Sequence, residues 1–316
     1  MVIKPAMQID FIIGIPRSGT TLLTTRLDTL PGVLALLENR IAISIHKDLH
    51  ADHVNWKYVD DQLHIIKTQL QTTDYKVEGN PIQSLKDSGS KEAQDAFARF
   101  YNHVSGRSLP PHSNVIDKNP NYTWHFNKLK MSYPKSKFVI TNRDPRGFIL
   151  SKRQKRIKDH LIYNVSFLAN VWLTFQKEIR EIRDTNKDIT HYVLYENLTA
   201  EPERILKELC SFLSIEYQDS LTEGTEVKLD LSSEREQIRQ KDLGRDINAS
   251  RAFSWKTDLT PNQRRRIEVI CRKEMTLQGF ETEFQPSGIL QAWILFRAFP
   301  FRILSRWRVS VIKSKP

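Results

Sequence analysis

The stretch that decides the fold is residues 9–21, which read IDFIIGIPRSGTT. Its first seven residues are apolar apart from one aspartate and one glycine, which is the pattern of a strand buried on both faces of a parallel sheet. Gly14 and Gly19 have the spacing G-x-x-x-x-G of a phosphate-binding loop, whose backbone N–H groups and following helix point at an anion. The residues predicted to form this anion site are Pro16, Arg17, Ser18, Gly19, Thr20 and Thr21.

The loop differs at one position from that of ATP-dependent enzymes. Those enzymes place a lysine directly after the second glycine to hold the β- and γ-phosphates, whereas this chain has Thr20 there. The cation of the loop is Arg17 instead. This difference favours a site for a 5′-phosphate over transfer of a γ-phosphoryl group. A glycine-rich turn that only caps a helix is the alternative for this stretch on its own.

Short apolar runs alternate with helical patterns along the rest of the chain. Strands are predicted over 9–15, 113–117, 137–142 and 190–195, with a weaker one over 33–37. Helices are predicted over 20–30, 91–104, 145–156, 167–182, 203–213 and 261–278. Strands separated by helices predict an α/β fold with a central parallel sheet and helices on both faces. Because ligands bind at the carboxyl ends of such strands, the residues directly after each strand are the site candidates.

A second anion site is predicted after the strand over 137–142. Arg143 stands at the end of this strand, and Ser151 lies about two turns along the helix that follows. An arginine at the strand end and a serine on the neighbouring helix can hold one phosphate from two sides. In the alternative interpretation, Asp144 only caps the helix and pairs with Arg146.

The segment 16–23 and the Arg143–Ser151 pair together resemble sulfotransferases that use 3′-phosphoadenosine 5′-phosphosulfate (PAPS), namely the glycan or heparan type and the tyrosylprotein type. The resemblance runs from residue 9 to about residue 280. It implies a P-loop-type three-layer α/β/α domain, with PAPS as the donor and no metal required. It also implies that the loop binds the 5′-phosphosulfate and that Arg143 and Ser151, eight residues apart as in the family motif, bind the 3′-phosphate.

Glu38 is the candidate general base. It directly follows the apolar run over 33–37, close to the loop, where a carboxylate can take the proton of an acceptor hydroxyl. The resemblance supports this role, because the family carries a catalytic Glu about twenty-one or twenty-two residues after the loop Arg or Lys. Glu38 comes twenty-one residues after Arg17. The alternative is a surface carboxylate paired with Arg40.

Lys118 is the second candidate cation, because it comes directly after the strand over 113–117. The family carries a similar Lys-x-Pro segment whose lysine contacts the transferring sulfonate or the acceptor, although Asn119 departs from the usual Thr or Asp. Arg17 and Lys118 would then stabilise charge on the sulfonate. An exposed turn lysine is the alternative.

Three further residues are assigned to the cofactor by the resemblance. Tyr195 ends the strand over 190–195, where the family often has a Tyr-Glu pair, and would line the cofactor pocket. Trp255 would bound the adenosine, and Lys256 would reach a phosphate from a late loop that suits a lid. The alternatives are a core aromatic for Tyr195 and a Trp packed at a helix start for Trp255.

Composition and charge limit the classes of partner that the chain could bind. The 316 residues contain 48 Lys and Arg against 37 Asp and Glu, a formal net charge of +11 that favours an anionic partner. Two cysteines exclude a disulfide framework and a four-cysteine zinc site, and the nine histidines show no metal-binding pattern. The basic run over 152–158 favours a solvated face or an anion-attracting rim over nucleic-acid binding, and we expect no nucleic-acid partner.

The chain divides into a domain over 1–284 and a basic, apolar C-terminal helical appendage over 285–316. The appendage has no acidic residue, and its arginines leave it too charged for a comfortable membrane span. Residues 289–312 are expected either to lie on a membrane surface or to pack on the domain or a partner chain, with the surface slightly favoured. Because the N-terminal residues fit neither a signal peptide nor a span, we expect a cytoplasmic location, with a peripheral one at the inner membrane surface left open.

The sequence thus predicts a PAPS-dependent sulfotransferase acting in line on an acceptor hydroxyl. A carbohydrate is slightly favoured as acceptor, a peptidyl tyrosine comes next, and a lipid or small metabolite follows. A nucleotide-dependent P-loop kinase is the alternative enzyme, which the missing lysine disfavours. A non-catalytic anion-binding or membrane-surface module is the alternative without chemistry.

Overall fold

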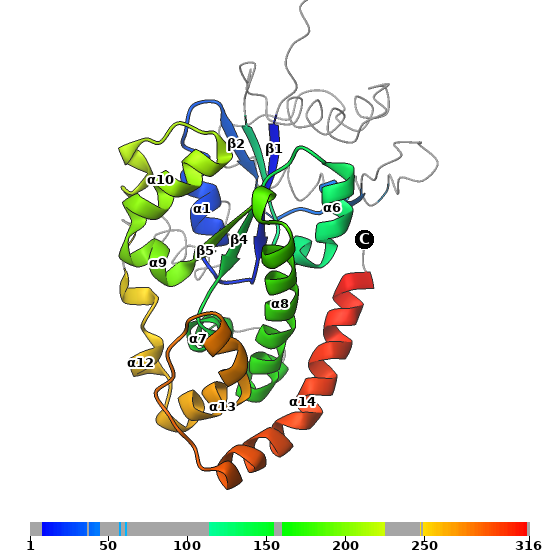
Figure 1. Ribbon diagram of the computed structural model, residues 1–316, viewed down its shortest axis with the longest axis vertical. Helices are drawn as coiled ribbons and strands as arrows, with labels where there is room; N and C mark the ends of the chain where they lie inside the picture. The colour runs from blue at the N-terminus through cyan, green and yellow to red at the C-terminus, as the bar shows by residue number, and fades with distance from the viewer. Residues whose placement is uncertain are drawn as a thin grey trace, which may run out of the picture.

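The computed structural model describes residues 8–36, 38–44, 57, 61, 114–154, 160–224, 247 and 249–314. Its centre is a five-stranded sheet in the order β2-β3-β1-β4-β5 (Figure 1). All four strand pairs are parallel. The strands are β1 (Gln8–Gly14), β2 (Val33–Leu36), β3 (Asn114–Lys118), β4 (Phe138–Asn142) and β5 (Thr190–Leu194). Every predicted strand, including the weaker one, is therefore confirmed.

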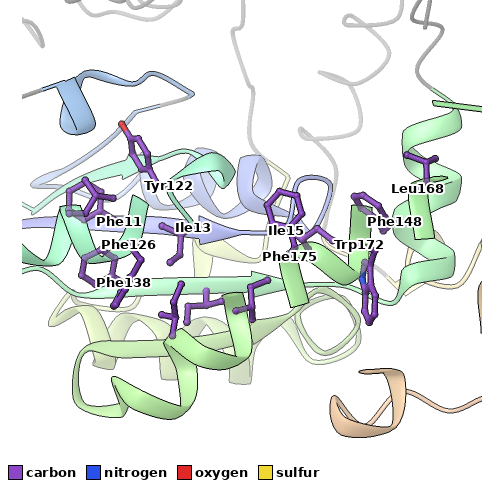
Figure 2. Close-up of a cluster of buried hydrophobic side chains, with 14 of the residues drawn as sticks. Phe11, Ile13, Ile15, Tyr122, Phe126, Phe138, Phe148, Leu168, Trp172 and Phe175 are labelled. Carbon is purple, nitrogen blue, oxygen red and sulfur yellow. The ribbon is translucent and has the colours of Figure 1, made fainter. Parts of the chain in front are cut away.

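Strand β1 is central because its residues bury apolar side chains on both faces of the sheet. Ile12 joins a cluster with Leu23 and Leu27, on the face covered by α1 (Thr20–Leu27), α9 (Tyr195–Ala200) and α10 (Pro202–Leu213). Phe11 and Ile13 point to the opposite face, where Figure 2 shows them in a cluster that includes the aromatic side chains of Phe126 and Phe138. The two clusters make three layers and confirm the predicted α/β/α fold.

The second face is covered by more helices. They are α2 (Ile41–Ser44), η2 (Pro120–His125), α6 (Phe126–Ser132), α7 (Pro145–Arg153), α8 (Val165–Thr185), α12 (Trp255–Asp258) and α13 (Pro261–Leu277). The short turns elsewhere are η3 (His160–Tyr163), η4 (Lys187–Ile189), η5 (Asp219–Leu221) and η6 (Ala249–Arg251). The predicted helix over 91–104 lies outside the described residues.

Helix boundaries follow local capping chemistry. Thr260 and Gln263 form a capping box at the start of α13, where the sequence has Thr followed by Pro. Asn164 caps α8 and begins it earlier than its apolar periodicity predicts. Helix α1 is shorter than predicted because the chain turns after Asp28, whose carboxylate accepts the backbone N–H of Ala35.

The C-terminal residues form one long helix, α14 (Gly288–Ser314), which lies along α8 (Figure 1). Lys313 pairs with Glu178 of α8 at 2.6 Å, and Phe301 and Leu304 pack against the core cluster of the second face. The appendage is therefore helical, as predicted, and one of its sides packs on the domain. In the part of the chain that is described, no helix has the length and hydropathy needed to cross a bilayer.

Candidate active site

The predicted loop leaves the sheet at Gly14, where only a glycine fits. Gly14 has φ 124°, and a Cβ there would meet the carbonyl oxygen of Thr141 at 2.1 Å. The Gly14 N–H donates to the Thr123 hydroxyl at 2.8 Å, and that hydroxyl donates back to the Gly14 carbonyl at 3.0 Å. The neighbouring strand and η2 thus fix the point at which the loop begins.

The loop itself is held in a left-handed conformation. Arg17 (φ 72°) and Gly19 (φ 83°) both lie in the region that non-glycine residues rarely adopt. The Ser18 hydroxyl bonds to the Ile15 carbonyl and to Thr141 Oγ1, so Ser18 braces the loop from inside. Because no side chain caps α1 in the described structure, the amide groups at its N-terminus face the loop uncapped. This arrangement suits an anion.

The second predicted anion site meets this loop. Arg17 Nε donates to Ser151 Oγ at 2.8 Å, and Arg143 Nη1 donates to the Arg17 carbonyl at 3.0 Å. Ser151 lies on α7 and Arg143 on the turn after β4, so three elements converge here. The structure therefore brings Arg17, Arg143 and Ser151 together, although 134 residues separate Arg17 from Ser151.

The Arg143 guanidinium is enclosed but incompletely bonded. It lies 4.2 Å from the centre of the Tyr195 ring, and Nη2 donates to the Arg251 carbonyl at 2.9 Å. Gly147 leaves room for it, since a Cβ at that position would meet Arg143 Nε at 2.8 Å. Arg143 Nε itself is buried without a hydrogen-bond partner among the described residues. A buried donor of this kind fits a phosphate oxygen.

Asp144 does cap α7, as the alternative interpretation of this segment required. Its carboxylate accepts the Arg146 N–H and pairs with the Arg146 guanidinium at 2.6 Å. Arg146 also pairs with buried Glu268 of α13 at 2.8 Å. This buried ion network engages Arg146 and leaves Arg143 to the loop, so the capping role of Asp144 is compatible with the predicted phosphate role of Arg143.

The late segment reaches the site through a residue that the sequence analysis missed. Trp255 is buried in the core cluster, 3.7 Å beneath the guanidinium of Arg146 rather than that of Arg143. Lys256 is exposed, with Nζ over the rings of Phe253 and Trp255. The described contact with Arg143 comes from the backbone of Arg251, for which a side-chain pattern gives no signal.

Lys118 and Glu38 form an ion pair on the other side of the loop. Lys118 Nζ lies 3.1 Å from Glu38 Oε1 and 3.4 Å from Thr21 Oγ1. Lys118 is 1% exposed, whereas the Glu38 side chain is 59% exposed. Lysine is almost never fully buried unless it is paired, and the partner of Lys118 is Glu38. Glu38 is accessible to a molecule that approaches from solvent.

A buried polar network places this pair. Asn39 Nδ2 donates to Asp117 Oδ1 at 2.8 Å, and the Tyr122 hydroxyl donates to Asp117 Oδ2 at 2.9 Å. Asn119 Nδ2 donates to the Asn39 carbonyl. Because Asn39 follows Glu38 and Asp117 precedes Lys118, these bonds fix the ends of β2 and β3 beside each other. The sequence analysis missed the network, since nothing local links residues 39 and 117.

Glu196, the residue after Tyr195, is a buried carboxylate beside Arg143 to which the sequence analysis assigns no role. Its Oε1 accepts the Asp144 N–H at 3.1 Å, directly beside Arg143, and Oε2 is buried without a described partner. Burial, with the charge of Asp144 adding to it, raises the Glu196 pKa to about 7. The sequence signal that could have identified Glu196 is its place in the Tyr-Glu pair directly after β5. Among the described residues, no three His, Cys, Asp or Glu side chains gather as a metal-binding group.

Comparison with known proteins gives a consistent picture. The family model described as "Sulfotransferase family" matches residues 11–219. A putative protein-tyrosine sulfotransferase of Caenorhabditis briggsae is 22% identical over 281 residues, which are 87% of this chain and 90% of that protein. A protein-tyrosine sulfotransferase of Drosophila melanogaster is 25% identical over 219 residues, which are 68% of this chain and 40% of that protein.

Solved structures share the fold. The sulfotransferase domain of the Synechococcus PCC 7002 olefin synthase superimposes with a TM-score of 0.61 at 18% identity, over 90% of this chain and 98% of that one. The sulfotransferase domain from the curacin biosynthetic pathway gives the same TM-score at 19% identity, over 88% of this chain and all of that one. At these identities the similarity establishes the architecture.

Proposed function

The chain belongs to the sulfotransferase family, and from that premise we propose that it transfers the sulfonate of PAPS to an acceptor hydroxyl. The observation that carries the proposal is the hydrogen bond from Arg17 to Ser151, which joins the anion-binding loop to the second anion motif. One loop would serve a single phosphate, whereas two joined anion sites suit a nucleotide with phosphates on both its 5′ and its 3′ side.

The donor-binding residues divide between the two sites. Arg17 and the uncapped amides at the start of α1 would hold the 5′-phosphosulfate, with the hydroxyls of Thr20 and Thr21 beside them. Arg143 and Ser151 would hold the 3′-phosphate, with the unpartnered Arg143 Nε as one donor. Tyr195 packs against the Arg143 guanidinium and would keep it in place.

The chemistry falls to the residues on the other side of the loop. PAPS supplies the sulfonate, whose bond to the 5′-phosphate breaks as the acceptor oxygen bonds to sulfur. Glu38 takes the acceptor proton, because its carboxylate is exposed to an incoming hydroxyl and fixed at 3.1 Å from Lys118. Lys118 and Arg17 stabilise the negative charge that develops on the transferring group and the departing phosphate. This division requires no metal ion.

The acceptor is proposed from the relatives. Both are named as protein-tyrosine sulfotransferases, which favours a tyrosyl hydroxyl over the carbohydrate hydroxyl that the sequence slightly favoured. The kinase alternative is not favoured, because the position after Gly19, where ATP-dependent enzymes carry the phosphate-binding lysine, is Thr20. The buried lysine beside a carboxylate also disfavours a module without chemistry.

Nucleotide binding provides the direct test. We expect 3′-phosphoadenosine 5′-phosphate to raise the melting temperature more than 5′-AMP or ATP does. At a hundredfold excess over its dissociation constant it should add about 2.7 kcal/mol to the free energy of unfolding. Ser151→Ala should reduce this gain by more than it reduces the smaller effect of 5′-AMP, since Ser151 also holds Arg17. Equal shifts with 5′-AMP would remove the basis for the 3′-phosphate site.

The acceptor is tested by turnover. Labelled PAPS would be incubated with tyrosine peptides, glycans and lipid extracts, and the labelled product identified. We expect label on tyrosine peptides. Label on glycans alone would keep the transferase and correct the acceptor.

A further inference from the structure

Helix α14 is apolar on two opposite sides. On one side Ile294, Ala298, Ser305 and Val309 are buried, where the helix lies along α8. The other side exposes large apolar residues, among them Phe296 at 79% and Trp307 at 63%. The members of this exposed stripe are Ile289, Trp293, Phe296, Phe299, Ile303, Trp307 and Val311.

The stripe is continuous along the helix. Its members are spaced three or four residues apart, which places them on one side of an α-helix. The 27 residues of α14 give a helix about 40 Å long. Soluble proteins rarely expose an unbroken apolar surface of this size unless it contacts another body. Figure 1 shows α14 at the edge of the molecule, with α8 on one side of it.

Cations border the stripe on both sides. Arg297 and Arg308 are eleven residues apart, three helical turns, and so lie along the same border. Arg302 and Arg306 lie along the other border, where they line a cavity of about 880 Å³ between α14 and helices α8 and α13, whereas Lys313 in the same lining pairs with Glu178 of α8. The sequence from residue 285 to the end contains no aspartate or glutamate.

We propose that α14 binds the surface of an anionic lipid bilayer, lying flat with the exposed stripe among the upper acyl chains. The bordering arginines would then face lipid phosphates, which is how amphipathic interfacial helices bind. Trp293 and Trp307 would sit at the level of the headgroups, where tryptophan is enriched. The buried side keeps α14 on the domain, so the domain itself comes to rest on the membrane.

Charge complementarity selects this occupant over a second copy of the chain. Two α14 helices packed stripe to stripe would bring their arginine borders together, and neither helix carries a carboxylate to pair with them. A nucleic acid would match the cations but would leave the apolar stripe in water. A bilayer with anionic headgroups matches both features. The inference does not depend on the proposed sulfonate transfer.

The test is co-sedimentation of the full-length chain with phosphatidylcholine vesicles, with and without phosphatidylglycerol. We expect binding only with the anionic lipid, weakened by high salt. Phe296→Ser with Trp307→Ser should reduce the partition coefficient at least 10-fold. Both side chains are exposed in the free protein, so their burial in the bilayer would contribute directly to binding. Met131→Ser with Leu277→Ser, two exposed apolar residues on other helices, is the matched control and should bind normally.

The charge contribution needs its own pair of variants. Arg302→Gln with Arg306→Gln should reduce partitioning roughly 25-fold, about 5-fold for each cation near the surface. Arg204→Gln with Lys207→Gln removes the same charge from α10, on the opposite face of the sheet, and should cost much less. Equal losses for the two pairs would show that binding depends only on the net charge of the protein, and would overturn the proposal.

Fluorescence quenching locates the contact. Acyl chains brominated near the headgroup should quench the tryptophan fluorescence of the bound protein. Trp293→Phe with Trp307→Phe should keep the binding and lose most of the quenching. Undiminished quenching in this variant would overturn the proposal. So would a dimer in solution that Phe296→Ser disrupts, because a second copy would then cover the stripe.

Discussion

At the scale of single residues, the candidate site consists of charged side chains that contacts with other residues of the domain hold in place. Arg17 is fixed by Ser151, and Lys118 by Glu38 and Thr21. These side chains are therefore already oriented before any ligand binds. Preorganised charge stabilises a transition state without a reorganisation cost at the moment of reaction, which is the main route to electrostatic catalysis.

Glu38→Gln tests the base. The amide keeps the size of the side chain and can still accept from Lys118, so nucleotide affinity should stay near normal. Turnover should fall about 100-fold or more, the usual contribution of a positioned base. Glu216→Gln, on an exposed residue after α10, is the control and should be fully active. Full turnover by Glu38→Gln would place the base elsewhere.

Glu196 predicts a pH dependence of stability. Its pKa is about 7 in the folded protein and near 4.5 in the unfolded chain, so between these values the folded state binds one proton more. The free energy of unfolding therefore falls as pH rises through this window. Glu196→Gln removes that loss while keeping the acceptor for the Asp144 N–H. The variant should gain about 3 kcal/mol over the wild type at pH 8 compared with pH 4.

Urea denaturation at the two pH values measures this difference. The buried Asp10, whose pKa is raised to about 6, titrates with the same sign in both proteins and cancels in the comparison. A constant difference between variant and wild type across the range would show that folding leaves the pKa of Glu196 unchanged.

At the scale of elements, α7 carries Ser151 of the proposed 3′-phosphate site and makes room for Arg143, the other residue of that site. Ser151 lies near its C-terminal end, and Gly147 in its first turn lies against the Arg143 guanidinium. A glycine inside a helix costs roughly 0.5–1 kcal/mol relative to alanine. The close approach of Arg143 explains why this cost is present here.

Gly147→Ala should therefore separate stability from binding. The alanine should leave the free energy of unfolding unchanged or raise it by up to about 1 kcal/mol. Its Cβ would displace the guanidinium and weaken binding of 3′-phosphoadenosine 5′-phosphate about 10-fold or more, measured by calorimetry. Gly288→Ala, with no atom near its added Cβ, should leave affinity unchanged. Normal affinity in Gly147→Ala would show that Arg143 needs no such space.

At the scale of the whole molecule, α14 extends the core of the second face beyond the sheet layers. Its buried side continues the packing of α8 and α13, whereas its exposed stripe packs on nothing in the described structure. The helix is thus both a structural element of the domain and the edge of a free surface. Substitutions on its two sides should differ in effect.

Ile294→Ala and Ile303→Ala make the same chemical change on the two sides. Ile294 is buried, so its truncation should cost about 2–4 kcal/mol of unfolding free energy. Ile303 is 57% exposed, and its truncation should cost less than about 1 kcal/mol. Thermal denaturation compares them directly. Equal small costs would mean that α14 contributes no packing to the domain.

The sequence by itself determined the architecture and the residues at each strand end. Apolar runs and loop spacing depend on neighbouring residues, so the parallel sheet, Arg17, Arg143 and Ser151 could be read locally. The capping role of Asp144 could also be read locally, because an N-cap residue directly precedes its helix in the sequence.

Only the tertiary structure decided which of these residues meet. The Lys118–Glu38 pair, the Asn39–Asp117 network and the Arg251 carbonyl on Arg143 join segments about 80 to 110 residues apart. Such contacts depend on strand order and crossover geometry, and no local pattern encodes them. The same reason applies to α14, because its composition shows only that the segment is apolar and basic. Packing on α8 decided which apolar side is buried and which remains exposed.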